Sequence, residues 1–246
     1  MKTKGIISII AALLFSACAE LTQIVNNIDL DAPLTETDIA AGLKEALRVG
    51  TDSAAYNLSA TNGYYGDDLV KILLPPEADI IVKNANKIPG GEKLVNDVIL
   101  SINRAAEDAA KDAGSIFYKA ITEMTITDAV NILKGEDNAA TEYFKSKTND
   151  NLFALYNPHI KKSIDKEIIA GYSAGETWSS MTGNYNKVAN SFVGQLAELK
   201  PVEIELDAYL TQKALDGLFL KIADEEKKIR TDPVARVTDI LKRVFS

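Results

Sequence analysis

The sequence predicts an all-α protein, a multi-helix bundle of about eight to ten helices with short connections. From Thr35 onward, apolar residues recur at intervals of three and four, which is the spacing of one buried helix face. Capping residues, glycines and prolines interrupt this pattern often, which indicates many separate helices. Long stretches in which apolar and polar residues alternate, as they would in a sheet, are absent from the sequence.

The beginning of the sequence has the pattern of an export signal. Two lysines precede an apolar stretch over residues 5–15, which falls short of the roughly 20 residues that a membrane-spanning helix needs. Two small residues then precede Cys18. This arrangement resembles the lipobox of bacterial lipoproteins. The resemblance implies a lipoprotein signal peptide over residues 1–17 and acyl chains on Cys18.

Cys18 is the only cysteine, so it has no partner for an intramolecular disulfide. An ordinary signal peptide followed by an incidental cysteine is the alternative. In the lipoprotein interpretation, residues 18–34 are the lipidated N-terminus and its tether. Ala19 follows the cysteine, and by analogy with enteric sorting rules this favours the outer membrane. We therefore predict a cell-envelope protein that is lipid-anchored in the outer membrane and faces the periplasm.

We expect residues 35–246 to form a single α-helical domain. Its first helix begins at Thr35 or Thr37 and ends near Ala60. Asp38 stands three residues after Thr35, where the acid of a capping box belongs.

Loops and further helices follow. Asn-Gly and a second glycine predict a turn-rich loop over residues 61–68, and two prolines stop the short apolar run 72–74. A strong helix is expected over 92–113, and Gly114 separates it from the next one. Pro158 is expected to kink or split the helix that contains it. The other helices of this half are predicted over 77–87, 115–124, 127–135 (capped by Thr127 and closed by Gly135), 137–145, and from Thr148 onward.

In the C-terminal part, the helical pattern is weak in one region and strong in another. Glycines, serines and threonines within residues 171–203 predict loops around Trp178, with a helix resuming over 184–199. Residues 205–230 are strongly helical. Asp232 is then expected to cap a last helix to Phe245, with proline at its first position.

Four stretches resemble the bacterial family called domain of unknown function 4197. The resemblance covers roughly residues 35–245. It implies an exported α-helical envelope protein, often a lipoprotein, and implies no reaction. The stretches that carry it are Asp207–Leu220 with Ile222-Ala223, Glu225-Glu226-Lys227, Ile229-Arg230 and Asp232-Pro233; Ala41–Leu47 with Tyr65-Gly66; Asn103–Glu107; and Met124–Ala129.

The charge of the chain excludes one class of partner. The formal net charge is −8, and removal of residues 1–18 with their two lysines would make it −10. An acidic chain disfavours binding to nucleic acid, which requires a basic surface. It also disfavours electrostatic docking on anionic lipid, so the acyl anchor on Cys18 is expected to attach the protein to the membrane. The partners left open are an envelope protein or an apolar ligand.

The residues give little support to catalysis. His159 is the only histidine, and no histidine or cysteine cluster suited to a metal is present. No Gly-x-Ser-x-Gly motif accompanies it. We therefore predict no catalytic residue, no metal and no cofactor, and favour a non-enzymatic binding or structural module. The alternative is an envelope hydrolase that uses carboxylates such as Glu203, Glu205 and Asp207, which requires two acids converging at about 5–10 Å.

Five residues are candidates for binding a ligand or partner. Tyr64 and Tyr65 lie in the glycine-rich loop, where they could clamp a ligand or instead pack as lids. Arg104 and Glu107 could belong to a buried polar network, or Arg104 could pair at the surface with Glu107 or Asp108. Asp216 interrupts an apolar helix and could pair with Lys213. Gly217, next to it, predicts a closely packed neighbour, because glycine costs about 1 kcal/mol relative to alanine inside a helix.

Overall fold

The computed structural model describes residues 34–79, 82, 91–169, 172–196 and 198–245. The predicted signal peptide 1–17, Cys18 and the tether up to residue 33 lie outside these described residues, as does most of the predicted helix 77–87. The all-α prediction is confirmed. The described residues form eight α-helices, with two short 3₁₀ turns and one small two-stranded sheet.

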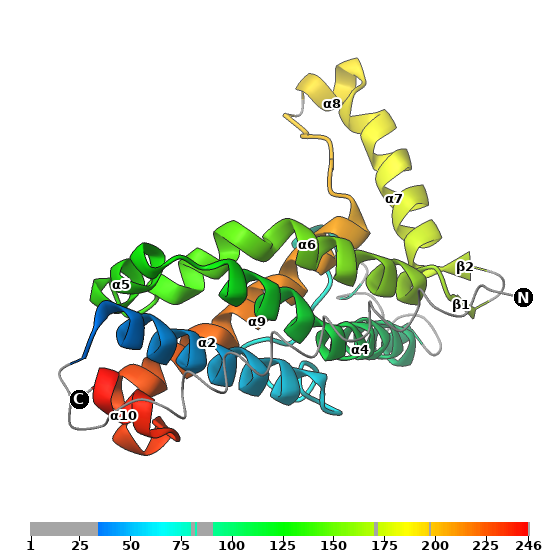
Figure 1. Ribbon diagram of the computed structural model, residues 1–246. Coiled ribbons are helices and arrows are strands. Elements are labelled where there is room, and N and C mark those ends of the chain that lie inside the picture. Colours follow the sequence, from blue (N-terminus) through cyan, green and yellow to red (C-terminus); the bar gives the residue numbers. More distant parts are fainter. Residues whose placement is uncertain (1–33, 80–81, 83–90, 170–171, 197, 246) are drawn as a thin grey trace, which may run out of the picture.

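Four long helices form the body of the protein (Figure 1). They are α2 (Glu36–Ser59), α4 (Gly91–Glu123), α6 (Ala139–Ile164) and α9 (Leu206–Thr231). Helix α4 packs against α2 and α6, and α9 packs against the same two helices. At the centre, the Phe117 ring of α4 meets the rings of Phe144 and Phe219 edge to face, with centroids 5.3 and 6.4 Å apart. The core thus joins helices from both ends of the chain.

Short helices close the end of the body where α2 begins. Helix α5 (Ile126–Lys134) contacts α2 and α6, and α10 (Asp239–Val244) packs against α2. The predicted capping box of Thr35 and Asp38 is confirmed at α2. At α5 the predicted cap Thr127 is wrong. Thr125 is the cap, because its side chain accepts the Asp128 N–H at 3.1 Å while Asp128 bonds back to the Thr125 backbone.

Two predicted helix boundaries are wrong, because α4 runs through Gly114 and α6 runs through Thr148. Pro158 lies inside α6 and does not split it. Around Gly114, Ala113 and Phe117 are fully buried, and their packing outweighs the lower helix propensity of glycine. The Thr148 hydroxyl donates to the Phe144 carbonyl at 2.7 Å, so it is satisfied within the helix rather than starting a new one. Burial of α6 on both sides of Pro158 likewise maintains the helix.

Residues 171–203 differ most from the prediction. A small antiparallel sheet of β1 (Glu167–Ile169) and β2 (Tyr172–Ser173) leads into α7 (Ala174–Ala189). The loops predicted around Trp178 are therefore wrong, since a capping box of Ser173 and Glu176 starts a helix there. The helix predicted over 184–199 is also wrong, because α7 ends at Ala189 and is followed by the short α8 (Phe192–Leu196).

The C-terminal helix α9 is confirmed, but the last helix begins later than predicted. Asp232 accepts the Val234 N–H at 2.9 Å and caps the 3₁₀ turn η3 (Pro233–Ala235) instead. Helix α10 is capped by Thr238. A second 3₁₀ turn, η1 (Pro76–Ala78), follows the extended run that the prolines end. Of the helices that the structure describes, none combines the length and hydrophobicity needed to cross a bilayer.

Candidate functional site

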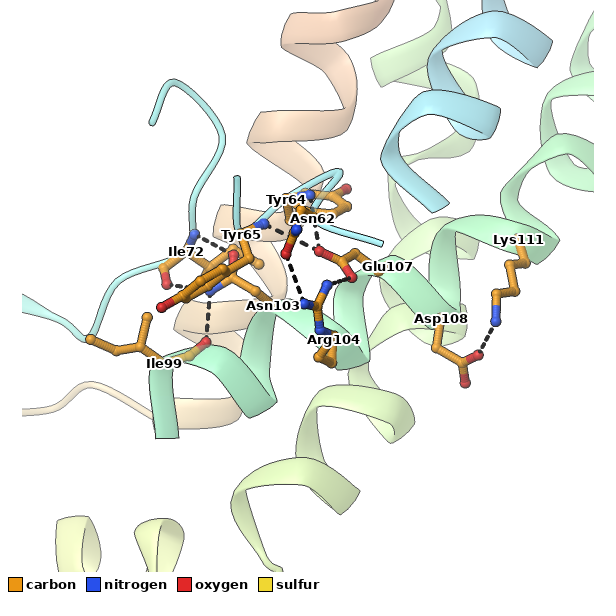
Figure 2. Close-up of polar contacts among 10 residues, drawn as sticks. All are labelled: Asn62, Tyr64, Tyr65, Ile72, Ile99, Asn103, Arg104, Glu107, Asp108 and Lys111. Carbon is orange, nitrogen blue, oxygen red and sulfur yellow. Dashed lines mark hydrogen bonds and ion pairs between the residues drawn. The ribbon is translucent and has the colours of Figure 1, made fainter. Parts of the chain in front are cut away.

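The loop over residues 61–74 lies on α4 and carries two of the candidate residues (Figure 2). Its entry is tightly turned, because Asn62 has a φ of 71°, in the left-handed region. A side chain on Gly63 would place its Cβ only 2.4 Å from the carbonyl oxygens of Asn57 and Leu58, so only glycine fits there. The loop can therefore turn back over the end of α2 and approach α4.

Tyr64 points into the protein and is completely buried. Its hydroxyl donates to the Ala214 carbonyl of α9 at 2.9 Å. Burial raises the pKa of Tyr64 well above its usual value. The neighbour predicted at Gly217 is Tyr64 together with Val70, because a Cβ on Gly217 would lie 3.1 Å from each. Tyr64 is thus a packing residue between the loop and α9.

Glu107 of α4 fixes the backbone of the same loop. One oxygen of its buried carboxylate, Oε1, accepts the N–H groups of Tyr64 at 3.3 Å and Tyr65 at 3.2 Å. The other oxygen, Oε2, pairs with Arg104, one helical turn away (Figure 2). The pairing of Arg104 with Asp108 is not observed, since Asp108 pairs with Lys111 and His159. Of the two alternatives that the sequence allowed for Arg104 and Glu107, the structure therefore has the buried polar network.

Arg104 and Tyr65 form the part of the site that solvent reaches. The Arg104 guanidinium donates to the Asn62 side-chain oxygen at 2.7 Å and lies 5.9 Å from the centre of the Tyr65 ring. Lys71 stands over the same ring at 4.1 Å. We call Asn62, Tyr65, Lys71 and Arg104 the open rim. It presents N–H donors and an aromatic face, which suit recognition of acidic or carbonyl groups.

Asn103 was missed by the sequence reasoning, although it holds the extended run after the loop. Its fully buried side chain donates to the Ile72 carbonyl at 2.8 Å and accepts the Ile72 N–H at 2.9 Å. Asn103 and Glu107 lie four residues apart, on the face that also carries the buried Ala106 and Ala110. Two polar residues placed within an alanine face are the sequence signal that could have identified this anchor.

Asp67 joins the loop to α9. Its carboxylate accepts the Leu69 N–H at 3.0 Å and pairs with Lys221 at 2.6 Å. The hydrogen bond from Lys221 is the main cause that lowers the pKa of Asp67. The loop is therefore bound to α4 and α9 at several points.

Tyr156 of α6 adds a polar group to the core near Tyr64. Its hydroxyl is buried and makes no hydrogen bond within the part of the chain that the structure describes. It lies near the Tyr64 hydroxyl, and burial raises the pKa of Tyr156 as well.

The remaining candidates lie apart from this site. Asp216 is exposed on α9, where Lys213 and Gln212 both bond to it at 3.1 Å, so the predicted pair with Lys213 is confirmed. His159 is half-buried and lies 3.3 Å from Asp108. Glu203 and Glu205 are exposed. Across the described ranges, no group of three or more histidine, cysteine, aspartate or glutamate side chains is placed to hold a metal ion.

A second buried glutamate, Glu226, lies in the last third of α9. Glu226 of α9 accepts the N–H groups of Ala140 at 3.0 Å and Thr141 at 2.9 Å, which start helix α6. Arg230 pairs with Glu226 at 2.9 Å and donates to the Ile132 carbonyl of α5 at 2.8 Å. The pair therefore caps both helices at the α5–α6 junction.

The interior next to this junction contains a small cavity. It measures about 20 Å³ and is bounded by residues of α2, α6 and α9 that include Leu43, Phe144 and Glu226. Sites for small organic ligands usually measure about 300–1,000 Å³, so this cavity holds one water molecule at most.

Comparisons with known proteins identify a family but no activity. Neither the curated proteins nor the solved structures contain a match to this chain. Residues 33–246 match the family described as protein of unknown function DUF4197. Because this match spans most of the sequence and agrees with the helical fold, the chain belongs to the DUF4197 family.

Proposed function

We propose that this protein is a lipid-anchored cell-envelope protein whose helical body is a non-enzymatic binding or structural module. The observation that carries the proposal is the order of residues at the start of the sequence. Two lysines, the apolar stretch 5–15 and two small residues lead to Cys18, the only cysteine. Each buried CH₂ of an acyl chain contributes about 0.8 kcal/mol, so several chains on Cys18 would hold the protein stably.

The arrangement of the buried acids supports a module without catalysis. Glu107 and Glu226 each accept two backbone N–H groups and pair with an arginine of their own helix. A carboxylate held in this way stabilises the fold and is not available to transfer a proton to a substrate. The small size of the cavity bounded by Leu43 and Phe144 favours a partner at the surface over an enclosed apolar ligand.

The test of the anchor is the chemical state of Cys18. The full-length protein is expressed in a bacterium with a lipoprotein pathway, purified from membranes and digested, and the N-terminal peptide is analysed by mass spectrometry. We expect a peptide that begins at Cys18 and carries the mass of acyl chains. The Cys18→Ser variant is the control and should retain residues 1–17. An unmodified Cys18, or a chain cleaved elsewhere, would contradict the proposal.

Location and partners need separate measurements. Separation of inner and outer membranes by density should place the anchored protein in the outer membrane, and protease should digest it only after that membrane is permeabilised. Crosslinking in intact cells, followed by mass spectrometry, should then recover a repeated envelope partner. Recovery of no partner in repeated experiments would favour a purely structural role.

A further inference from the structure

Helices α7 and α8 form an arm that projects away from the body (Figure 1). Helix α7 spans 16 residues, which corresponds to a length of about 24 Å. At the far end of the arm, Phe192, Val193 and Leu196 of α8 are 80%, 70% and 77% exposed. We call these three, with the exposed Tyr185 and Val188 of α7, the arm tip. Such a cluster differs from scattered apolar residues, because the largest exposed apolar patch of a protein is often functional.

The sequence of the arm is unusually poor in charge. Charged residues make up 25% of the whole chain, yet residues 177–197 contain only Lys187. Glu198 and Lys200 follow, so residues 177–200 carry a net charge of +1 in a chain of net charge −8. The arm therefore lacks the acidic character that disfavours contact with anionic lipid.

The base of the arm is fixed to the body. Trp178 is buried, and its ring N–H donates to the Ile204 carbonyl at 3.0 Å. Asn186 pairs with the backbone of Val202, accepting its N–H and donating to its carbonyl at 2.8 Å each. The returning segment is thus fastened along α7, and the arm tip is held outward.

The backbone of the tip is largely satisfied by internal hydrogen bonds. The Ser191 hydroxyl accepts the Gly194 N–H at 3.1 Å, and the Ser191 carbonyl accepts the Gln195 N–H at 2.9 Å. The Leu199 N–H donates to the Gly194 carbonyl at 2.9 Å. Backbone groups that are already paired can enter an apolar medium without the penalty of losing water.

We propose that the arm tip inserts into the interfacial layer of the bilayer that carries the acyl anchor. The proposal rests on the anchoring of Cys18 set out above. A tether over residues 19–34, if extended, would span about 55 Å, which is enough for the body to turn the arm toward the membrane. In the sequence, Lys187 adjoins Val188 and Lys200 lies four residues after Leu196. Lysines near an apolar tip favour lipid phosphates while the apolar side chains enter the acyl region.

The shape of the tip favours a bilayer over a second copy of the chain. The tip is the projecting end of an arm (Figure 1), and a projecting end fits a deformable lipid surface without a complementary groove.

The test uses the full chain and a fluorophore on the tip. If Cys18 is acylated, Val193→Cys provides the only free thiol, which is labelled with a nitrobenzoxadiazole dye. The lipidated protein is then reconstituted into vesicles of phosphatidylethanolamine and phosphatidylglycerol. We expect a severalfold rise in emission, a shift to shorter wavelength, and quenching by doxyl-labelled lipid. Adding Phe192→Ser and Leu196→Ser, both at exposed positions, should abolish all three changes.

The matched control is Val234→Cys in η3, at a valine that is 86% exposed and lies outside the arm. The dye at residue 234 should keep the emission that it has in water and should not be quenched by doxyl-labelled lipid. A tip dye that stays unquenched by doxyl lipid would overturn the proposal. If the emission of that dye also shifts with protein concentration, a second copy of the chain covers the tip. If its emission shifts only in native membranes, a protein partner covers the tip.

Labelling of the wild-type chain distinguishes a missing anchor at Cys18 from an arm tip that does not insert. An acylated Cys18 takes up no thiol dye, whereas a free Cys18 does, which would contradict the proposed function alone. In that case the dye is placed at residue 193 in a Cys18→Ser chain that lacks residues 1–17, and this chain is added to the same vesicles. Quenching there would support insertion of the tip without the anchor, and its absence would overturn insertion.

Discussion

Two buried glutamates of this protein make the same kinds of contact, but their surroundings differ. Glu107 pairs with Arg104, and Glu226 with Arg230, each within one helical turn. Each carboxylate also accepts two consecutive backbone N–H groups from a distant segment. The arginines differ, because the Arg230 side chain is 12% exposed and binds α5 carbonyls, whereas the Arg104 side chain is 39% exposed and borders the open rim.

This difference separates a structural joint from a surface that remains accessible. Arg230 is enclosed between helices, so removal of its partner leaves a buried charge. Arg104 can turn into water when its partner is lost. We therefore expect the Glu226–Arg230 pair to matter most for stability, and Arg104 to matter mainly for what the open rim contacts.

The largest effect is expected for Glu226→Ala. This change leaves the first N–H groups of α6 and the Arg230 guanidinium without their acceptor, and breaking a buried pair costs about 3–5 kcal/mol. Urea unfolding followed by circular dichroism measures the loss. Glu123→Ala, at an exposed acid of α4, is the control and should leave the midpoint unchanged. If Glu226→Ala lowers the free energy of unfolding no more than Glu123→Ala does, Glu226 does not stabilise the α5–α6 junction.

A smaller effect is expected for Glu107→Ala. Two backbone N–H groups lose their acceptor at a cost of about 2–3 kcal/mol, while Arg104 is solvated. Hydrogen exchange should speed up at the amides of Tyr64 and Tyr65 more than in α6. Uniform acceleration across both regions would show that the loop and the bundle unfold together, and that the two glutamates do not act locally.

Tyr64→Phe is expected to cost about 1 kcal/mol at neutral pH, through loss of the hydroxyl bond to Ala214. Burial raises the pKa of Tyr64, so its contribution is complete below pH 10, the usual tyrosine pKa. Above that pH the unfolded chain loses a proton that the folded chain keeps, and stability falls. Tyr64→Phe should therefore reduce the decline in unfolding free energy as the pH rises above about 10. Tyr56→Phe, at an exposed tyrosine, should leave that decline unchanged.

The smallest effect is expected for Arg104→Ala, which should lower the unfolding free energy by about 1 kcal/mol or less, because its guanidinium is partly solvated. Thermal and urea unfolding measure this change. Arg230→Ala is the matched variant and should be clearly more destabilising. Equal losses would mean that exposure does not distinguish the two arginines.

Much of the fold could be predicted from local sequence. The capping box at Thr35 and the glycine that ends α5 mark helix ends through contacts within a few residues. The apolar pattern of α9 predicts a central helix, and Gly217 predicts a close neighbour. The arm could not be predicted in this way, because the glycines and serines of residues 171–203 resemble a loop, whereas Trp178 and Asn186 are held by a segment near Val202.

By itself, the sequence determined where several of the helices lie and which charged residues share a helix face. Only the tertiary structure decided which of those faces is covered. Lys213 with Asp216 and Glu226 with Arg230 have similar spacing, yet the first pair is exposed and the second is buried. The spacing of two residues on a helix fixes their mutual distance, but their burial depends on segments that are remote in the chain.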